Sequence, residues 1–238
     1  MSSTACSELR FAAGGRSADL KLVVSPRARV MRLRVDRRTG EVVLTLPPRA
    51  SRRKALEWAA GHRPWIERQL AEVAQAEPLG PGAVLPLRGE PHRIDWEASR
   101  PRVPRLADGR LVAGGPAEGL EARLLRWLKR QALDLLAAET AEFAAKAGVT
   151  VSRVAVGDPV SRWGSCSSSG AIRYSWRLLL APDFVRRATV AHEVAHRVHM
   201  HHGPAFHALV EALLGADPKP ARLWLRRQGA ALHRIGGR

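Results

Sequence analysis

The chain lacks the features that would place it in a membrane or outside the cell. No apolar run approaches the ~20 residues that a membrane-spanning helix needs, and residues 1–10 lack the basic and then apolar layout of a secretory signal. The only cysteines are Cys6 and Cys166, too few for a disulfide framework. We therefore expect a cytoplasmic protein with no disulfide and no membrane partner.

Acidic residues are also scarce relative to basic ones. The sequence has 39 Lys and Arg against 22 Asp and Glu, which gives a formal net charge of +17. Clustered arginines can neutralise phosphates, so a weak nucleic-acid association is one interpretation. The other is that arginine is simply abundant, because the arginines are spread along the chain and no zinc-finger or RNP-type motif accompanies them.

Histidine, by contrast, is concentrated in one segment. Six of the nine histidines fall between His192 and His207, and His192, Glu193 and His196 form a His-Glu-x-x-His motif. Positions i and i+4 of a helix share a face, so two imidazoles can bind one ion. Glu193 lies about 100° round the helix from His192, close enough to hold a metal-bound water. The pattern indicates a metallohydrolase with two ligands and a general base on one helix.

A catalytic zinc usually takes three protein ligands, so a third must come from elsewhere. His199 lies about 10 Å along the helix axis from His192, too far to share one ion. The Gly203-Pro204 pair ends the helix, which we predict to begin at Asp183 and end near Met200. The reversed chain then favours His202 as the third ligand, with His201 pointing elsewhere. His207 and Glu211 remain alternatives.

Hydrophobic periodicity and turn residues predict the remaining elements. Predicted strands cover residues 19–24, 30–35, 42–46, 151–156 and 171–176 and parts of 84–114, with turns at 38–40, 89–91 and 108–109. Predicted helices cover residues 51 to about 77, 120–147, 204–214 and 220–232. The first of these helices has Ser51 as its N-terminal cap and a break at Pro64.

A glycine- and serine-rich segment, residues 161–170, precedes the strand predicted at 171–176. Peptidases can hold an extended substrate against a strand edge, and Gly164 would allow a close approach. The candidate substrate-binding residues are Trp163, Gly164, Ser165 and Tyr174. The alternative is a hairpin in which Trp163 and Cys166 fill the core, which we prefer for Cys166.

Two auxiliary roles have candidates in the sequence. The oxyanion formed during hydrolysis needs a hydrogen-bond donor, for which Tyr174, His199 and Arg173 are near in sequence. Metal-bound histidines are usually oriented through their other ring nitrogen. Glu211, in the helix predicted at 204–214, is the candidate for that partner.

Four sequence blocks resemble the YgjP-like metallopeptidases, bacterial zincins related to the SprT-like proteases. The blocks are Arg162-Trp-Gly-Ser-Cys-Ser167, Trp176-Arg-Leu-Leu-Leu-Ala-Pro182, His192-Glu-Val-Ala-His196 and His202-Gly-Pro-Ala-Phe206. Their order and spacing match, and the resemblance covers roughly residues 20–230. It implies one Zn²⁺ per chain on His192, His196 and His202, with Glu193 as the catalytic acid/base.

The fold class expected from these observations is α+β. We expect a zincin-like catalytic domain at residues 119–238, with a small antiparallel sheet packed on the His-Glu-x-x-His helix. A β-rich region with a helix is expected at 19–118, after a disordered tail at 1–18. The predicted function is zinc-dependent cleavage of peptide bonds in a peptide or protein substrate. Alternatives are a nucleic-acid-associated protease of the SprT-like kind and a non-catalytic protein with a structural zinc.

Overall fold

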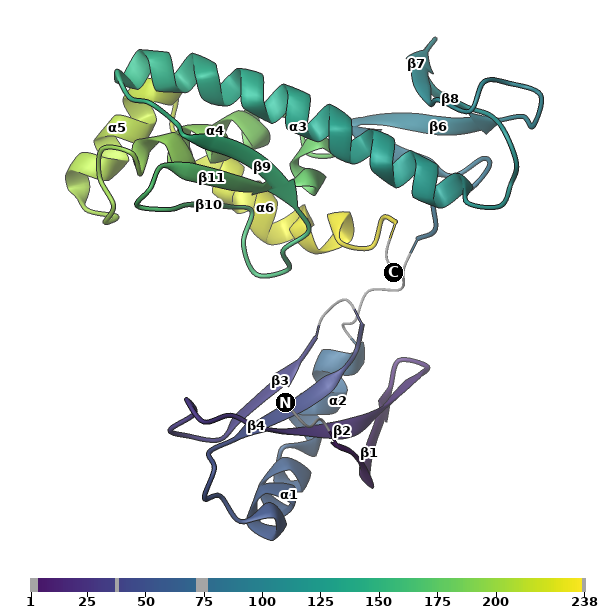
Figure 1. The fold of residues 1–238 in the computed structure, drawn as a ribbon, viewed down its shortest axis with the longest axis vertical. Helices are drawn as coiled ribbons and strands as arrows, with labels where there is room; N and C mark the ends of the chain where they lie inside the picture. Colours follow the sequence, from purple (N-terminus) through teal and green to yellow (C-terminus); the bar gives the residue numbers. More distant parts are fainter. Residues whose placement is uncertain (1–3, 37–38, 72–76, 237–238) are drawn as a thin grey trace. The chain divides into compact units, whose positions relative to one another are not determined.

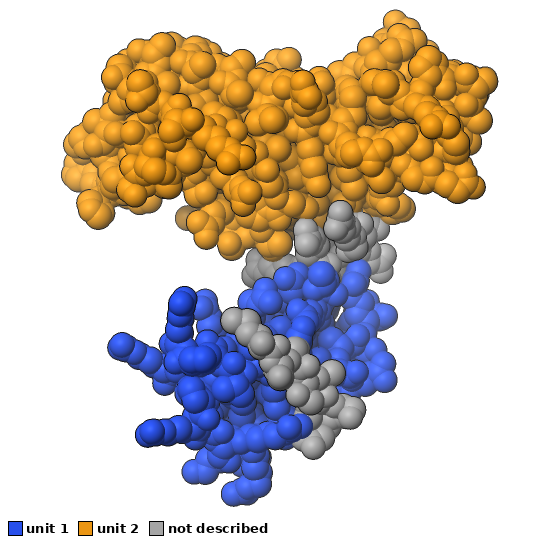
Figure 2. All heavy atoms as spheres, in the orientation of Figure 1, with its two compact units in different colours: residues 1–76, 238 blue, residues 77–237 orange. Residues whose placement is uncertain are grey.

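The chain forms two compact units, each with its own apolar core. The computed structural model describes residues 4–36, 39–71 and 77–236. The units comprise residues 1–76 together with residue 238, and residues 77–237, coloured blue and orange in Figure 2. Buried residues of the first core lie between Phe11 and Leu70, and those of the second between Leu79 and Ile235. No helix in the described part of the chain is long and apolar enough to span a membrane.

The first unit is a four-stranded sheet with two helices. The strands, in sheet order, are β1 (Thr4–Ala13), β2 (Arg16–Val24), β4 (Val42–Leu46) and β3 (Arg32–Val35). Strand β2 is antiparallel to β1 and parallel to β4, and β3 is antiparallel to β4. The tail predicted at residues 1–18 therefore differs from the structure, because β1 and the start of β2 pair as a hairpin over most of it. Residues 1–3 lie outside the described residues, as does part of the predicted turn at 38–40.

The helix predicted from Ser51 onward forms as two pieces. Helix α1 (Arg52–Gly61) is capped by the Ser51 side chain, which accepts a hydrogen bond from the Lys54 amide. Helix α2 (Arg63–Ala71) starts next to Pro64, where proline is tolerated because the first helical amides have no intrahelical acceptor. The predicted cap and break are thus confirmed. Residues 72–76, the predicted continuation to about residue 77, lie outside the described residues.

The second unit begins with another small sheet. Its strands, in sheet order, are β5 (Val84–Leu87), β6 (Glu90–Trp96), β8 (Arg110–Ala113) and β7 (Arg105–Ala107). The tight turns at Arg88-Gly89 and Asp108-Gly109 have positive φ at both residues, as two-residue hairpin turns require.

This sheet belongs to the second unit and not to the first. Leu85, Ile94 and Leu111 are fully or almost fully buried in the same core as Leu124 of the following helix. The sequence prediction divided the chain at 118/119, whereas the structure divides it at 76/77. Short apolar strands do not reveal in sequence which core they enter, since that depends on the helix they pack against.

A long helix supports the remaining elements. These are α3 (Leu120–Ala147), β9 (Arg153–Gly157), β10 (Gly164–Cys166), β11 (Ala171–Ser175), the 3₁₀ helix η1 (Trp176–Leu179), α4 (Asp183–Ala195), α5 (Pro204–Leu214) and α6 (Lys219–Leu232) (Figure 1). The bounds predicted for α3 and α5 are confirmed. The sheet order is β10-β11-β9, with β10 antiparallel and β9 parallel to β11. The sheet is therefore mixed and not wholly antiparallel.

Two buried arginines hold these elements in place. Arg186 of α4 donates to both carboxylate oxygens of Glu139 on α3, at 2.8 and 3.0 Å, and also pairs with Asp183. Arg177 of η1 pairs with Asp158 and donates to the carbonyl groups of Leu232 and Ile235 near the end of the chain. Because buried charges are tolerated only when fully paired, both arginines fix the relative positions of α3, α4 and α6.

Candidate metal centre

The candidate centre is built on the last turn of α4. His192 and Glu193 lie in this helix, and His196 is the residue that caps its end. The helix ends at Ala195, five residues before the predicted Met200. Beyond that point the amide of residue 197 bonds the carbonyl only three positions earlier, at Val194, which tightens the last turn.

The early helix end has a consequence for His196. The ring nitrogen Nδ1 of His196 lies 3.1 Å from the carbonyl oxygen of His199. That hydrogen bond fixes the ring orientation and leaves Nε2 free to bind a metal. A backbone carbonyl of the turn thus does what the sequence prediction assigned to Glu211, an exposed residue of α5.

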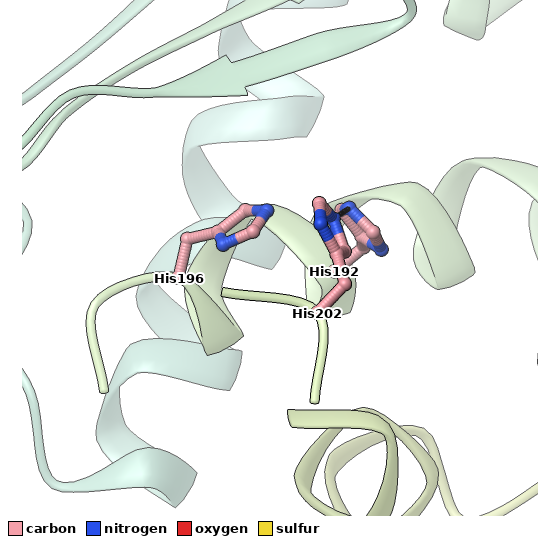
Figure 3. A group of neighbouring side chains, drawn as sticks. All are labelled: His192, His196 and His202. Atoms are coloured by element: carbon pink, nitrogen blue, oxygen red, sulfur yellow. Dashed lines mark hydrogen bonds between the residues drawn. The ribbon is translucent and has the colours of Figure 1, made fainter. Parts of the chain in front are cut away.

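Three histidines converge from the helix and the following turn. The candidate ligand atoms of His192, His196 and His202 all lie within 4.8 Å of one another (Figure 3). His202 reaches the helix because Gly203 is extended and Pro204 starts α5, which turns the chain back as predicted. The other candidates, His199, His207 and Glu211, are not part of this group. The ring of His207 lies 6.4 Å from that of His202, centroid to centroid.

The spacing and protonation of this group suit a metal ion. The Nε2 atoms of His192 and His202 are 3.1 Å apart, and two nitrogens on one tetrahedral zinc at about 2.1 Å are about 3.4 Å apart. Burial, and then the charges of His196, His202 and Arg222, lower the pKa of His192 to about 4. Burial also lowers the pKa of His196. Both shifts favour the neutral form of these two rings, which is the form that binds a metal.

Glu193 lies beside the histidines in an apolar environment. It is 5 % exposed, and the structure gives its carboxylate no hydrogen-bond partner among the described residues. Burial raises its pKa to about 7, against the lowering effect of Arg162. A carboxyl group that titrates near neutral pH can accept and return a proton, as a general base and acid must.

Strand β10 forms the opposite wall of the centre. A Cβ atom on Gly164 would lie 2.5 Å from Oε1 of Glu193, so only glycine permits this approach of strand and carboxylate. Gly164, Ser165 and Cys166 line a cleft of about 430 Å³ with Arg162, Met200, Glu193 and the three histidines. Because β10 is an edge strand, its outer backbone groups are available for pairing. Two of the predicted substrate-binding residues, Gly164 and Ser165, thus line the cleft.

The other two predicted substrate-binding residues lie elsewhere. Trp163 lines a neighbouring pocket that also touches His192 and Glu193. Tyr174 is fully buried, and its hydroxyl oxygen lies 3.0 Å from Oγ1 of Thr140 on α3. Burial raises the pKa of Tyr174. It is a core residue and not a substrate contact, because alternate residues of β11 face the core and Tyr174 shares that face with Ile172.

The remaining oxyanion candidates are also displaced from the cleft. Arg173 is exposed on the other face of β11, and His199 is not among the residues that line the cleft. Arg162, which lines the cleft, was not among the site residues predicted from the sequence. Its signal was present, since it immediately precedes the Trp-Gly pair that approaches Glu193.

A helix-borne His-Glu pair, a second histidine one turn later and a third from a returning loop define a metallohydrolase-type centre. The comparison with protein families agrees. Residues 29–228 match the family model described as YgjP-like, metallopeptidase domain. The chain therefore belongs to the YgjP-like metallopeptidase family, and the resemblance seen in its sequence blocks is confirmed. Comparisons with curated proteins and with solved structures each returned no match.

Proposed function

We propose that this protein is a cytoplasmic zinc peptidase in which Glu193 is the general acid and base. The observation that carries the proposal is the position of Glu193, a buried carboxyl group beside three converging histidines. Carboxyl groups with shifted pKa values in a cleft are typical of catalytic sites. Membership of a metallopeptidase family supports the same reaction class.

His192, His196 and His202 would hold one zinc ion. When bound, zinc supplies Lewis acidity, which acidifies water and polarises the carbonyl group of the scissile amide. The protein supplies the proton transfers. Glu193 accepts a proton from the attacking water as its oxygen bonds to the carbonyl carbon. Glu193 then donates that proton to the amide nitrogen as the carbon–nitrogen bond breaks.

Strand β10 and Arg162 would position the substrate. An extended peptide can pair with the open edge of β10, and Gly164 brings that edge against Glu193. The exposed guanidinium of Arg162 lines the same cleft. It is placed to stabilise negative charge that develops on the carbonyl oxygen, a role for which Arg173 and Tyr174 are displaced.

Metal content tests the ligand set, and hydrolysis tests the function. Untagged wild-type protein should contain about one zinc per chain by mass spectrometry. His202→Ala should lose most of it, whereas His201→Ala, which changes a neighbouring exposed histidine outside the group, should retain it. Zinc-loaded wild type should hydrolyse an unfolded protein substrate. A protein that binds zinc without any hydrolysis would contradict the peptidase function and support a structural zinc.

A second candidate function is recruitment to nucleic acid, in the manner of the SprT-like proteases. Arg153, Arg162 and Arg173 line a hollow of about 450 Å³ on the exposed face of the β10-β11-β9 sheet. The structure shows no ion pair for any of the three among the described residues. If this face binds phosphates, DNA affinity should fall steeply with salt, and Arg153→Gln with Arg173→Gln should flatten that dependence. No DNA binding at low salt would exclude it.

A further inference from the structure

A second pocket adjoins the metal centre. It has a volume of about 280 Å³ and shares Gly164, His192 and Glu193 with the cleft described above. Its other walls come from α4, α5 and α6 and from the loop before β10. The remaining lining residues are Trp163, Ala188, Thr189, His207, Val210, Pro218, Ala221, Arg222 and Leu225. A group in this pocket would therefore lie directly beside Glu193.

Apart from His192 and Glu193, which it shares with the metal cleft, the pocket has mainly apolar walls. The polar wall residue Thr189 donates its hydroxyl hydrogen bond to the Val185 carbonyl of its own helix, at 3.0 Å. That hydroxyl is therefore already satisfied. His207 and Arg222 are exposed residues and so belong to the rim. The pocket thus offers apolar surface inside and positive charge at its mouth.

The aromatic wall of the pocket is fixed in place. The indole of Trp163 lies so close to Gly229 of α6 that a Cβ atom there would be 2.7 Å from it. On another side the Trp163 ring lies 5.0 Å from the ring of His233, centroid to centroid. The pocket is therefore preformed, as binding sites for small groups usually are.

The volume of the pocket indicates the size of the side chain that it can bind. An apolar cavity of about 150 Å³ accommodates benzene, so a pocket of about 280 Å³ takes an aromatic or long aliphatic side chain. A small side chain would leave much of it unfilled, whereas burial of a large apolar side chain is favourable.

We propose that this pocket selects substrates in which a residue flanking the scissile bond has a large apolar side chain, and that Arg222 at its rim disfavours lysine and arginine. The proposal rests on the proposed peptidase function. Arg222 is suited to this role because it is exposed, the structure shows no ion pair for it among the described residues, and its charge acts on His192. A cationic side chain entering here meets like charge at the mouth and, apart from Glu193 on the side of the metal centre, mainly apolar walls inside.

Peptide binding to zinc-loaded Glu193→Gln protein tests the proposal without hydrolysis. The probes are acetylated glycine-serine peptide amides that carry a single Phe, Leu, Ala or Lys. Calorimetry should show Phe and Leu peptides binding at least about tenfold more tightly than Ala or Lys peptides. Equal binding of the Phe and Ala peptides would overturn the proposal.

Two variants in this background assign the selectivity to the pocket. Ala221→Leu fills it from the buried face of α6 and should abolish the preference for Phe over Ala. Ala230→Leu changes an exposed alanine of the same helix and should leave that preference unchanged. Retention of the preference in a folded Ala221→Leu protein would place the binding site elsewhere.

Arg222→Gln provides an independent test, because this exposed position tolerates substitution without loss of the fold. It should raise the affinity for the Lys peptide severalfold and leave the affinity for the Phe peptide unchanged. An unchanged affinity for the Lys peptide would show that Arg222 does not disfavour cationic side chains and would remove it from the proposal. Failure of the peptidase function itself would be seen separately, as absence of hydrolysis by zinc-loaded wild type.

Discussion

The two halves of α4 differ in how their buried ionisable side chains are paired. In the first half, Arg186 is 1 % exposed and pairs with Glu139 and Asp183, while Asp183 also pairs with Arg88. In the second half, Glu193 is 5 % exposed and has no hydrogen-bond partner among the described residues. One helix thus carries a paired network and an unpaired carboxyl group.

This difference separates scaffold from chemistry. A buried ion pair tolerates the loss of water because each charge has a partner, but loss of one partner is strongly destabilising. A buried carboxyl group without a partner instead has a raised pKa, which suits proton transfer. Such a group contributes nothing to stability. The paired half of α4 therefore fixes the helix on α3, and the unpaired half carries the carboxyl group to which we assign the proton transfers.

The largest expected effect is on catalysis by Glu193→Gln. This change removes the proton carrier and should lower kcat/KM about 10²–10⁴-fold. Zinc content and thermal stability should stay the same or rise, because a desolvated carboxyl is replaced by a neutral group of the same shape. Peptide hydrolysis, metal analysis and thermal unfolding measure the three quantities. A loss of stability comparable to that of a broken ion pair would contradict the conclusion that Glu193 is unpaired.

The reciprocal change is Glu139→Gln on α3, which removes the partner of Arg186. It leaves the charge of Arg186 buried and undercompensated and should cost about 3 kcal/mol of unfolding free energy, as measured by urea denaturation. Activity per folded molecule should be retained. Glu142→Gln is the matched control on the same helix. Its ion pairs are partly exposed, so it should cost at most about 1 kcal/mol.

Gly164→Ala tests whether the unpaired carboxyl depends on close packing against β10. The added methyl group would overlap Oε1 of Glu193 and displace it, which should lower kcat/KM about 10²-fold. Gly80→Ala is the control, because a Cβ atom there meets nothing within 4 Å. Full activity in Gly164→Ala would show that the position of the carboxylate is not critical.

The smallest expected effect is a pH dependence in the paired half. The hydrogen bond from Arg88, and next that from Arg186, hold the pKa of Asp183 below its ordinary value of 3.8. Its stabilisation is therefore present above that value and is lost as the pH falls through the lower, folded-state pKa. Asp183→Asn should be about 1 kcal/mol less stable than wild type at pH 7. Urea denaturation at several pH values should show that this difference in unfolding free energy decreases in acid. A difference that stays constant with pH would contradict the ionic contribution.

Much of the secondary structure could be predicted because it is encoded locally. The bounds of α3 and α5 follow from apolar periodicity and from Gly203-Pro204. The break near Pro64 follows from the missing amide of proline. The unit boundary could not be predicted, because β5–β8 become part of the second core only through contact with α3. The role of Tyr174 was predicted wrongly for a similar reason, since its burial depends on Thr140 of another element.

The sequence by itself determined the order of the elements, the spacing of His192 and His196 on one helix face, and the turn that brings His202 back. These depend on neighbouring residues and on fixed helical geometry. Only the tertiary structure decided which histidines converge, that Glu193 is desolvated against Gly164, and that α6 closes an apolar pocket beside it. Burial and convergence arise from contacts between residues far apart in the chain, which local sequence patterns do not encode.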